Sequence, residues 1–488
     1  MKKIITFVSL AVFLSGCSLD INTDPNYPSN VSSTLVLPSV ENSIATVVGD
    51  GMYNYAGFFA QYYDQMPEAN QYNTIADYTF TESTQLIDRS YRTLYAGALE
   101  DVDVVLKDVN STAADKYAAT VLRAFSFQLL VDNMDKTPYS EALKGNANAM
   151  PKWDDGRNVY EGVLKELDAA EANLGSATMK CSDLLLSKSV TQWQGFANAL
   201  RLRMYLRFID AGVDVAGYTA KVKNLVDAGV FFKDDVKFDV YSDQADKRNP
   251  WYAANKVNLA MNHVGAYPIV SYLQATNDPR IAYSFVKATK TGTYAGMLPG
   301  SKDALSTTKK NADYSFLNYF PTKPVYFFTQ SELQFLLAEV YIRFYGDDAK
   351  AQAAYQAGID ADFSARGMAE SPSVMYGSAG KVAWSTASDA DAKLKLIYMQ
   401  KWVALCYMDH MEAWSEIRRT DCPKLSTMTA SQINADATVY TPGELITPMR
   451  NNGIAYVKRM FFPIVARQLN TNTPASVPVT TSVWWDKK

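Results

Sequence analysis

Two ring-rich segments of the chain carry side chains suited to binding a polar ligand that has apolar faces. Residues 62–80 and 292–320 interleave tyrosines with amides and carboxylates. Sugars present C–H faces that pack on aromatic rings, their hydroxyl pairs suit bidentate Asn, Gln, Asp and Arg partners, and peptides suit the same surface. The alternative for each tyrosine is that its ring packs a loop against the core. The predicted ligand contacts are Tyr72, Asn73, Tyr78, Tyr252, Tyr294 and Tyr314.

The thiol of Cys17 is a reactive group that directly follows an export signal. Two lysines precede the eleven-residue apolar run Ile4–Leu14, which is too short to span a bilayer. Ser15-Gly16 supplies the small residues that a signal peptidase needs, and a cysteine directly after the cut can be acylated. We expect residues 1–16 to be a lipoprotein signal peptide and residues 17–40 a tether that begins at lipidated Cys17. The alternative is a plain secreted protein that is cut nearby.

The composition leaves little material for catalysis or metal binding. His263 and His410 are the only histidines, and the three cysteines after Cys17 match neither a zinc ligand set nor a disulfide framework. The sequence contains no Gly-x-Ser-x-Gly elbow, Walker loop, His-Glu-x-x-His motif or dinucleotide fingerprint. A glycoside hydrolase needs two carboxylates about 5–9 Å apart, and nothing marks out such a pair among the 51 acidic residues. We therefore expect no enzymatic activity, no cofactor and no metal.

The net charge argues against nucleic acid as a partner. The expected signal peptide contains two lysines and no acidic residue. Its removal leaves 45 basic and 51 acidic residues, which is a net charge of −6. Mild acidity disfavours both nucleic acid and anionic headgroups. No segment after the signal reaches a membrane-spanning length without charge. We expect the membrane to be contacted through the lipid anchor only.

Helical spacing predicts the elements that position these loops. Apolar residues recur three and four apart in pairs of helices, which indicates a mainly α protein with four degenerate tetratricopeptide-like hairpins forming a spine. One of these helices is expected to run unbroken from Asp391 to Arg419. The insert at 213–328 reads as irregular and loop-rich, with a short strand near 236–240. Residues 41–488 thus form one domain, with hairpins near 84–132, 155–211, 330–366 and 391–434.

Several motifs follow the signal in order along the chain: Asp24–Asn26, Leu122–Phe125, Pro138–Leu143, Trp193–Arg203, Ser331–Glu339, Tyr355–Ile359, Gln400–Trp402, Glu412–Arg419 and Arg459–Pro463. Together they resemble those of the SusD/RagB-type nutrient-binding outer-membrane lipoproteins. The resemblance implies a lipid-anchored binding protein with a four-repeat spine and an irregular ligand-facing half. It also implies a TonB-dependent outer-membrane porin of the SusC type as partner, with glycans or peptides captured at the cell surface and not cleaved.

These motifs are better explained by structure than by ligand binding. We expect Ser331 to cap a helix, Glu332 to be stabilised in its first turn, and Arg418 and Arg419 to complement a helix end or pair with acids on a neighbour. An alternative function remains open, in which the repeats serve as an envelope scaffold for protein–protein interaction.

Overall fold

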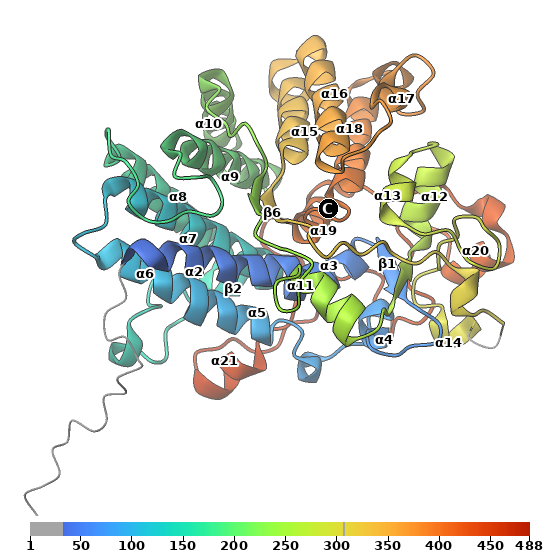
Figure 1. Ribbon diagram of the computed structural model, residues 1–488, viewed down its shortest axis with the longest axis horizontal. Helices are drawn as coiled ribbons and strands as arrows, with labels where there is room; N and C mark the ends of the chain where they lie inside the picture. The colour runs from blue at the N-terminus through green and yellow to red at the C-terminus, as the bar shows by residue number, and fades with distance from the viewer. Residues whose placement is uncertain (1–32, 306–307) are drawn as a thin grey trace, which may run out of the picture.

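Long helices pack together in one half of the molecule, while short helices, short strands and loops form the other half (Figure 1). The computed structural model describes residues 33–305 and 308–488. Cys17, the signal peptide and residues 17–32 of the expected tether lie outside the described residues. The prediction of a mainly α protein is confirmed.

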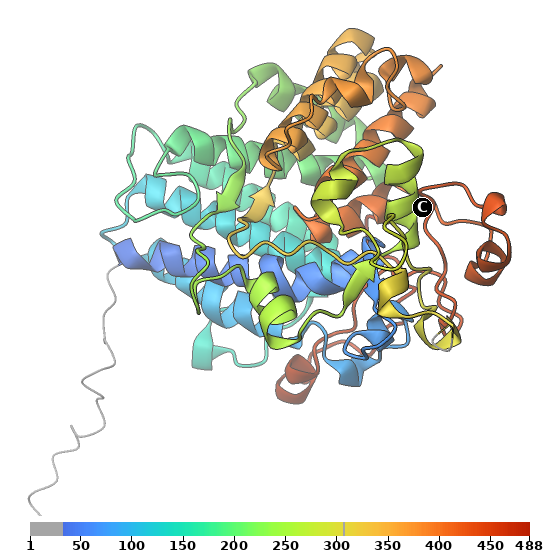
Figure 2. The ribbon, with the colours of Figure 1, turned by 45° about the vertical axis from the view of Figure 1, so that its right-hand side comes forward.

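The helical half is built from helices that pack against their neighbours in the chain. α7 packs against both α6 and α8, α9 packs against α10, and α15 packs against α16 and α18. Figure 2 shows α15, α16 and α18 standing side by side. The elements are α2 (Ser33–Thr46), α5 (Asp88–Arg92), the π-helical turn η4 (Thr93–Leu99), α6 (Glu100–Lys107), α7 (Ala113–Met134), α8 (Gly156–Ala172), α9 (Val190–Asp210), α10 (Val215–Ala228), α15 (Gln330–Val340), η8 (Tyr341–Tyr345), α16 (Asp348–Ala365), α18 (Ala390–Leu405) and α19 (His410–Thr420).

Short helices and antiparallel strand pairs make up the rest of the described chain; most lie in the loop-rich half, whereas β2 and β3 pack on α7 and α8. β1 pairs with β5, β2 with β3, and β4 with β6, which includes the strand expected near 236–240. The helices are η2 (Val47–Gly51), α3 (Met52–Phe59), α4 (Asn73–Ala76), α11 (Pro250–Tyr252), η6 (Ala253–Asn258), α12 (Tyr267–Ala275), α13 (Arg280–Ser284), α14 (Lys302–Leu305), α17 (Ser373–Tyr376), α20 (Ala430–Ala435) and α21 (Ile464–Leu469). The strands are β1 (Tyr63–Gln65), β2 (Lys136–Thr137), β3 (Asp154–Asp155), β4 (Val236–Phe238), β5 (His263–Gly265) and β6 (Val325–Phe328).

The helix starts follow from local capping chemistry. Thr112 accepts a hydrogen bond at Oγ1 from the backbone N–H of Asp115 (3.1 Å), and Asp115 accepts one from the N–H of Thr112 (2.9 Å). This capping box satisfies two donors that the first turn of α7 otherwise leaves unpaired. α15 is capped by Thr329 rather than by Ser331, whose hydroxyl donates instead to the carbonyl of Gly358 on α16 (2.7 Å). The expectation that Ser331 caps the helix was therefore wrong by two residues.

The helix expected from Asp391 to Arg419 is in fact two helices, α18 and α19. The chain leaves the helical conformation at Cys406, Tyr407 has a positive φ of 72°, and Asp409 caps α19. The carbonyls at the break are satisfied from outside the segment, because the Arg366 guanidinium donates to those of Val403 and Ala404 in α18 (3.3 and 3.0 Å) and to that of Cys406 (2.8 Å). A side chain 40 residues away in the sequence thus stabilises the break.

Two further boundaries differ from the predictions. Residues 33–40, expected to belong to the tether, begin α2, and Val36, Leu37 and Val40 are buried in the core. The insert at 213–328 begins with the helix α10, which packs on α9 and was expected to be irregular. Among the described residues, no helix has both the length and the apolar character to cross a bilayer.

Buried ion pairs join the long helices. Arg203 on α9 binds both oxygens of Glu332 on α15 at 2.7 Å, and Arg207 on α9 binds Glu412 on α19 at 2.7 Å. Arg419 on α19 binds Glu339 on α15 at 2.6 Å. We name these three arginines and their carboxylate partners the ionic core.

The carboxylates of the ionic core respond differently to burial. Burial raises the pKa of Glu332 to about 8 and that of Glu412 to about 7, against the attraction of their arginines. Glu339 is held in its charged form by the basic side chains around it. Burial alone raises the pKa of Glu339, but Arg419, Arg343 and Lys401 outweigh it and lower the pKa to about 2. The family-like motifs that carry these residues are structural, as expected for Glu332 and Arg419.

Glu41 on α2 is a buried carboxyl that is paired with another acid rather than with a base. Its Oε2 accepts from the N–H of Leu184 (2.9 Å), while Oε1 has no donor and the Asp183 carboxylate lies close by. Burial, followed by the charge of Asp183, raises the pKa of Glu41 to about 10.

We predict that Glu41→Gln stabilises the protein at alkaline pH. Between pH 4.5 and 10 the unfolded chain ionises Glu41 while the folded chain keeps its proton, so the free energy of unfolding falls by about 1.4 kcal/mol per pH unit as the pH rises. The glutamine amide of the variant keeps a hydrogen-bond acceptor and a donor at position 41, and it does not ionise. Thermal unfolding should show a higher Tm for E41Q at pH 8 and a shrinking difference toward pH 5. A Tm difference that is independent of pH would contradict this assignment.

Candidate functional site

β5 lies between the two ring-rich segments and joins them. Tyr63 of β1 lies opposite Gly265 and Gln65 opposite His263, and Val264 bridges to Phe316 on the other side of β5. The described parts of the segments 62–80, 249–265 and 292–320 are therefore neighbours, and we name them the loop face. In Figure 1, α11, β1 and α4 lie below α12 and α13.

Tyr72 is tied to the helical segment that carries Tyr252 through the buried amide of Asn255. The Tyr72 hydroxyl donates to Asn255 Oδ1 (2.6 Å), and Asn255 lies three residues after Tyr252 along the chain. The Tyr72 ring stacks on His263 with ring centroids 4.9 Å apart. Both tyrosines remain partly exposed. The structure thus places Tyr72 against the segment that carries a second predicted residue, 180 positions away in the sequence.

Asn73 opens onto a polar cluster on the same face. Its amide donates to Asp303 Oδ2 (3.3 Å), and Asp303 also pairs with Lys302 (2.9 Å) and with Arg450. Burial raises the pKa of the neighbouring Asp77 to about 6, although the charge of Arg450 opposes the shift. The cluster offers donors and acceptors of the kind that bind hydroxyl groups.

Tyr294 lies farther along the loop face, beside α12. Its carbonyl accepts a hydrogen bond from Gln274 on α12 (3.0 Å), and Lys287 Nζ lies 5.8 Å from the centre of its ring. The ring is partly exposed. Tyr294 therefore marks the end of the loop face that adjoins α12.

Tyr78 and Tyr314 do not fit the prediction that they contact a ligand. Tyr78 is 1% exposed, its ring packs on Phe59, and Gln61 donates to its hydroxyl. Tyr314 is 7% exposed and packs with Met66 and other apolar side chains beneath the loops. Both rings pack loops against the protein interior, which is the alternative stated above.

A buried ring cluster supports Tyr72 from below. Burial lowers the pKa of His263 to about 3, so its imidazole is neutral at physiological pH. Nε2 lies 3.0 Å from Asn54 Oδ1, a side-chain acceptor, so Nε2 carries the proton and Nδ1 accepts from the Tyr319 hydroxyl (2.8 Å). Trp251 stacks on Tyr319 with centroids 4.8 Å apart. Together these contacts fix the platform on which Tyr72 rests.

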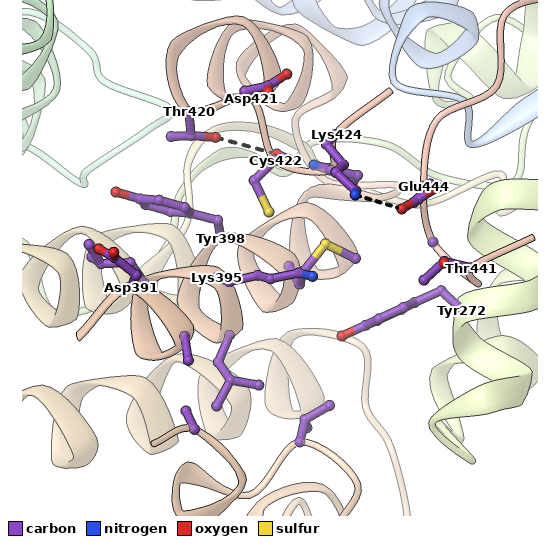
Figure 3. Close-up of a pocket in the computed structure, with 18 of the residues that line it drawn as sticks. Tyr272, Asp391, Lys395, Tyr398, Thr420, Asp421, Cys422, Lys424, Thr441 and Glu444 are labelled. Atoms are coloured by element: carbon purple, nitrogen blue, oxygen red, sulfur yellow. Dashed lines mark hydrogen bonds and ion pairs between the residues drawn. The ribbon is translucent and has the colours of Figure 1, made fainter. Parts of the chain in front are cut away.

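A cavity of about 800 Å³ lies beside the loop face, between α12 and α18 (Figure 3). Tyr272 of α12 and Tyr398 of α18 line it, and the segments 420–424 and 441–444 close its rim. We name this cavity the α12–α18 groove. Gly443 has a φ of 91° and lies against the Tyr272 ring, so any side chain there would be strained and would collide with it.

The comparisons with known proteins agree with this architecture. The family described as "Starch-binding associating with outer membrane", of the SusD-like type, matches residues 25–441. The chain belongs to this SusD-like family. No curated protein sequence matches the chain.

Solved structures share the SusD-like fold over nearly the whole chain. A SusD homolog from Bacteroides uniformis is 23% identical, with a TM-score of 0.73 over 94% of this chain and 100% of that one. A chitin-binding SusD homolog from Flavobacterium johnsoniae is 20% identical, with a TM-score of 0.71 over 92% and 98%. At these identities the likeness shows the fold alone.

Sequence reasoning missed the α12–α18 groove of this SusD-like protein. Its walls come from segments that are more than 100 residues apart, and helical spacing assigned residues 391–434 to the spine. The available signal was the polar residues Asp391 and Lys395, which α18 does not bury. Among the described residues, no group of three His, Cys, Asp or Glu side chains is arranged to hold a metal ion.

We predict that His263 makes this SusD-like protein less stable in acid. Below pH 6.5 the His263 imidazole takes up a proton in the unfolded chain, whereas in the folded protein it stays neutral down to about pH 3. The free energy of unfolding therefore falls by about 1.4 kcal/mol per pH unit as the pH drops. Denaturant unfolding from pH 6.5 to 4.5 should give His263→Gln a shallower slope by this amount.

The matched control for this measurement is Tyr319→Phe. It removes the hydrogen bond to Nδ1 and keeps the imidazole, so its slope should equal that of the wild type. Equal slopes in H263Q and the wild type would show that the His263 ring takes up its proton equally in both states.

Proposed function

We propose that this SusD-like protein captures oligosaccharides at the loop face and passes them unchanged to a partner TonB-dependent transporter of the SusC type. Acylated Cys17 anchors it to the outer membrane, facing the cell exterior. Peptides are the second ligand class that the same surface suits.

The observation that carries this proposal is the hydrogen bond that ties Tyr72 to Asn255, on the helical segment that carries Tyr252. Two partly exposed rings on a supported platform offer flat apolar faces, and the polar cluster at Asn73 lies next to them. This combination suits a sugar, which has apolar faces and hydroxyl edges. The description of the family as starch-binding and the chitin-binding relative support a glycan as the ligand.

The loop face offers a direct mutational test of glycan capture. Tyr252→Ala and Tyr294→Ala should each weaken the binding of maltohexaose or chitohexaose at least tenfold, about 1.4 kcal/mol, because each removes a ring face from the sugar. Isothermal titration calorimetry measures the affinity, and chromatography of the same mixtures should recover the oligosaccharide uncleaved.

Tyr345→Ala is the matched control for the two loop-face variants. Tyr345 is a partly exposed tyrosine on η8 in the helical half, with its hydroxyl on Asp227. Its loss should leave the affinity unchanged. Wild-type affinity in both loop-face variants would discard the site, and wild-type protein that binds no oligosaccharide and no peptide would discard the function.

The anchor is tested independently of the ligand. Metabolic labelling with a fatty acid should mark the wild-type protein and leave Cys17→Ser unlabelled, because the thiol is the only acylated group in the proposal. The variant should also be released from the membrane fraction. Equal labelling of both proteins would show that the lipid is attached to another residue. Labelling of neither protein would show that the protein carries no lipid anchor.

A further inference from the structure

The α12–α18 groove has two tyrosine walls that are held in place from behind. The Tyr398 hydroxyl donates to the buried Glu339 Oε1 (3.0 Å), and Gln400 donates to the Tyr272 hydroxyl (3.3 Å). Figure 3 shows Tyr398 and Tyr272 on opposite sides of the groove, with Lys395 between them. Fixed rings lose little conformational entropy when a ligand packs on them.

Polar side chains with no ion pair or side-chain hydrogen bond to any described residue surround these rings. Asp391, Lys395, Asp421 and Thr441 are such residues, whereas Lys424 pairs with Glu444 on the same rim (3.1 Å). Lys381 and Lys488 add two further basic side chains to the lining. Unpaired charges of both signs are thus interspersed, which favours a ligand that forms many hydrogen bonds and carries no strong charge of its own.

One short helix, α12, lies between the groove and the loop face. Tyr272 of α12 lines the groove, and Gln274, two residues later, donates to the carbonyl of Tyr294 on the loop face (3.0 Å). An α-helix with its side chains is about 10 Å across. A chain of a few sugar rings therefore suffices to reach from Tyr294 past α12 into the groove.

We propose that the α12–α18 groove is a second subsite for a neutral oligosaccharide, so that one long chain occupies both the loop face and the groove. Its volume of about 800 Å³ lies within the range of sites that bury small ligands. The inference rests on glycan capture at the loop face. It adds that the affinity increases with the length of the oligosaccharide and that residues of α18 contact its far end.

The test fills the groove without touching the loop face. Ala392 lines the groove and Ala390, at the exposed start of the same helix, does not. Calorimetry with maltose, maltohexaose, chitobiose and chitohexaose compares Ala392→Trp, its matched control Ala390→Trp, the loop-face variant Tyr252→Ala and the wild type. Circular dichroism and Tm values of the four proteins verify that the fold is kept.

The wild type should bind the better hexasaccharide at least tenfold more tightly than its disaccharide. A392W should lower only the hexasaccharide affinity, to the level of the disaccharide, while A390W behaves as the wild type. Loss of affinity in Y252A with none in A392W would overturn the groove and leave the proposed function standing. Failure of the wild type to bind any of the four sugars would overturn both. If A392W blocked a neutral oligopeptide and no sugar, the groove would be a site for another ligand class.

Discussion

Salt bridges buried between helices are the constraint on which the rest of this structure depends. Arg203, Arg207 and Arg419 lie in the interior, where an unpaired charge is very costly. Each therefore fixes the position of the helix that carries its carboxylate partner, through contacts of 2.6–2.7 Å. Removing one partner of such a pair costs about 3–5 kcal/mol, because the other charge stays buried and uncompensated. α9, α15 and α19 are in this way locked in one arrangement.

The locked helices position the loop face through α19 and α3. His410, the first residue of α19, stacks on Tyr53 of α3 with ring centroids 3.6 Å apart. β1 follows α3 in the chain, and the Tyr62 hydroxyl, one residue before β1, donates to the carbonyl of Trp402 on α18 (2.5 Å). Rings and carbonyls thus connect the helical half to β1, and β5 joins β1 to Phe316 in the second ring-rich segment. Buried side chains in this way support the loop face.

Much of this architecture could be predicted from the sequence, because the spacing of apolar residues within a short segment indicates a regular helix. The helix pairs and the strand near 236–240 depend on side chains close in sequence, and they were found. The break between α18 and α19 was missed because Arg366, which satisfies the carbonyls at the break, lies outside that segment. The helical start of residues 33–40 was missed because turn-forming residues precede it.

The candidate site was predictable in composition and less so in detail. Tyr72 is tied to the segment that carries Tyr252, whereas Tyr78 and Tyr314 are buried, because composition does not tell which ring of a mixed segment turns inward. The groove depends on the meeting of α12, α18 and residues 441–444, and no local pattern encodes that meeting.

The measurement that tests the central claim most directly is hydrogen exchange, followed by mass spectrometry, with and without a bound oligosaccharide. The central claim is that an ionically locked set of helices presents the loop face, which binds without rearrangement of the helices. It predicts that peptides from α9, α15 and α19 exchange slowest in both states, and that ligand protects peptides from the loop face. Rapid exchange of these helices, or protection confined to them, would contradict the account.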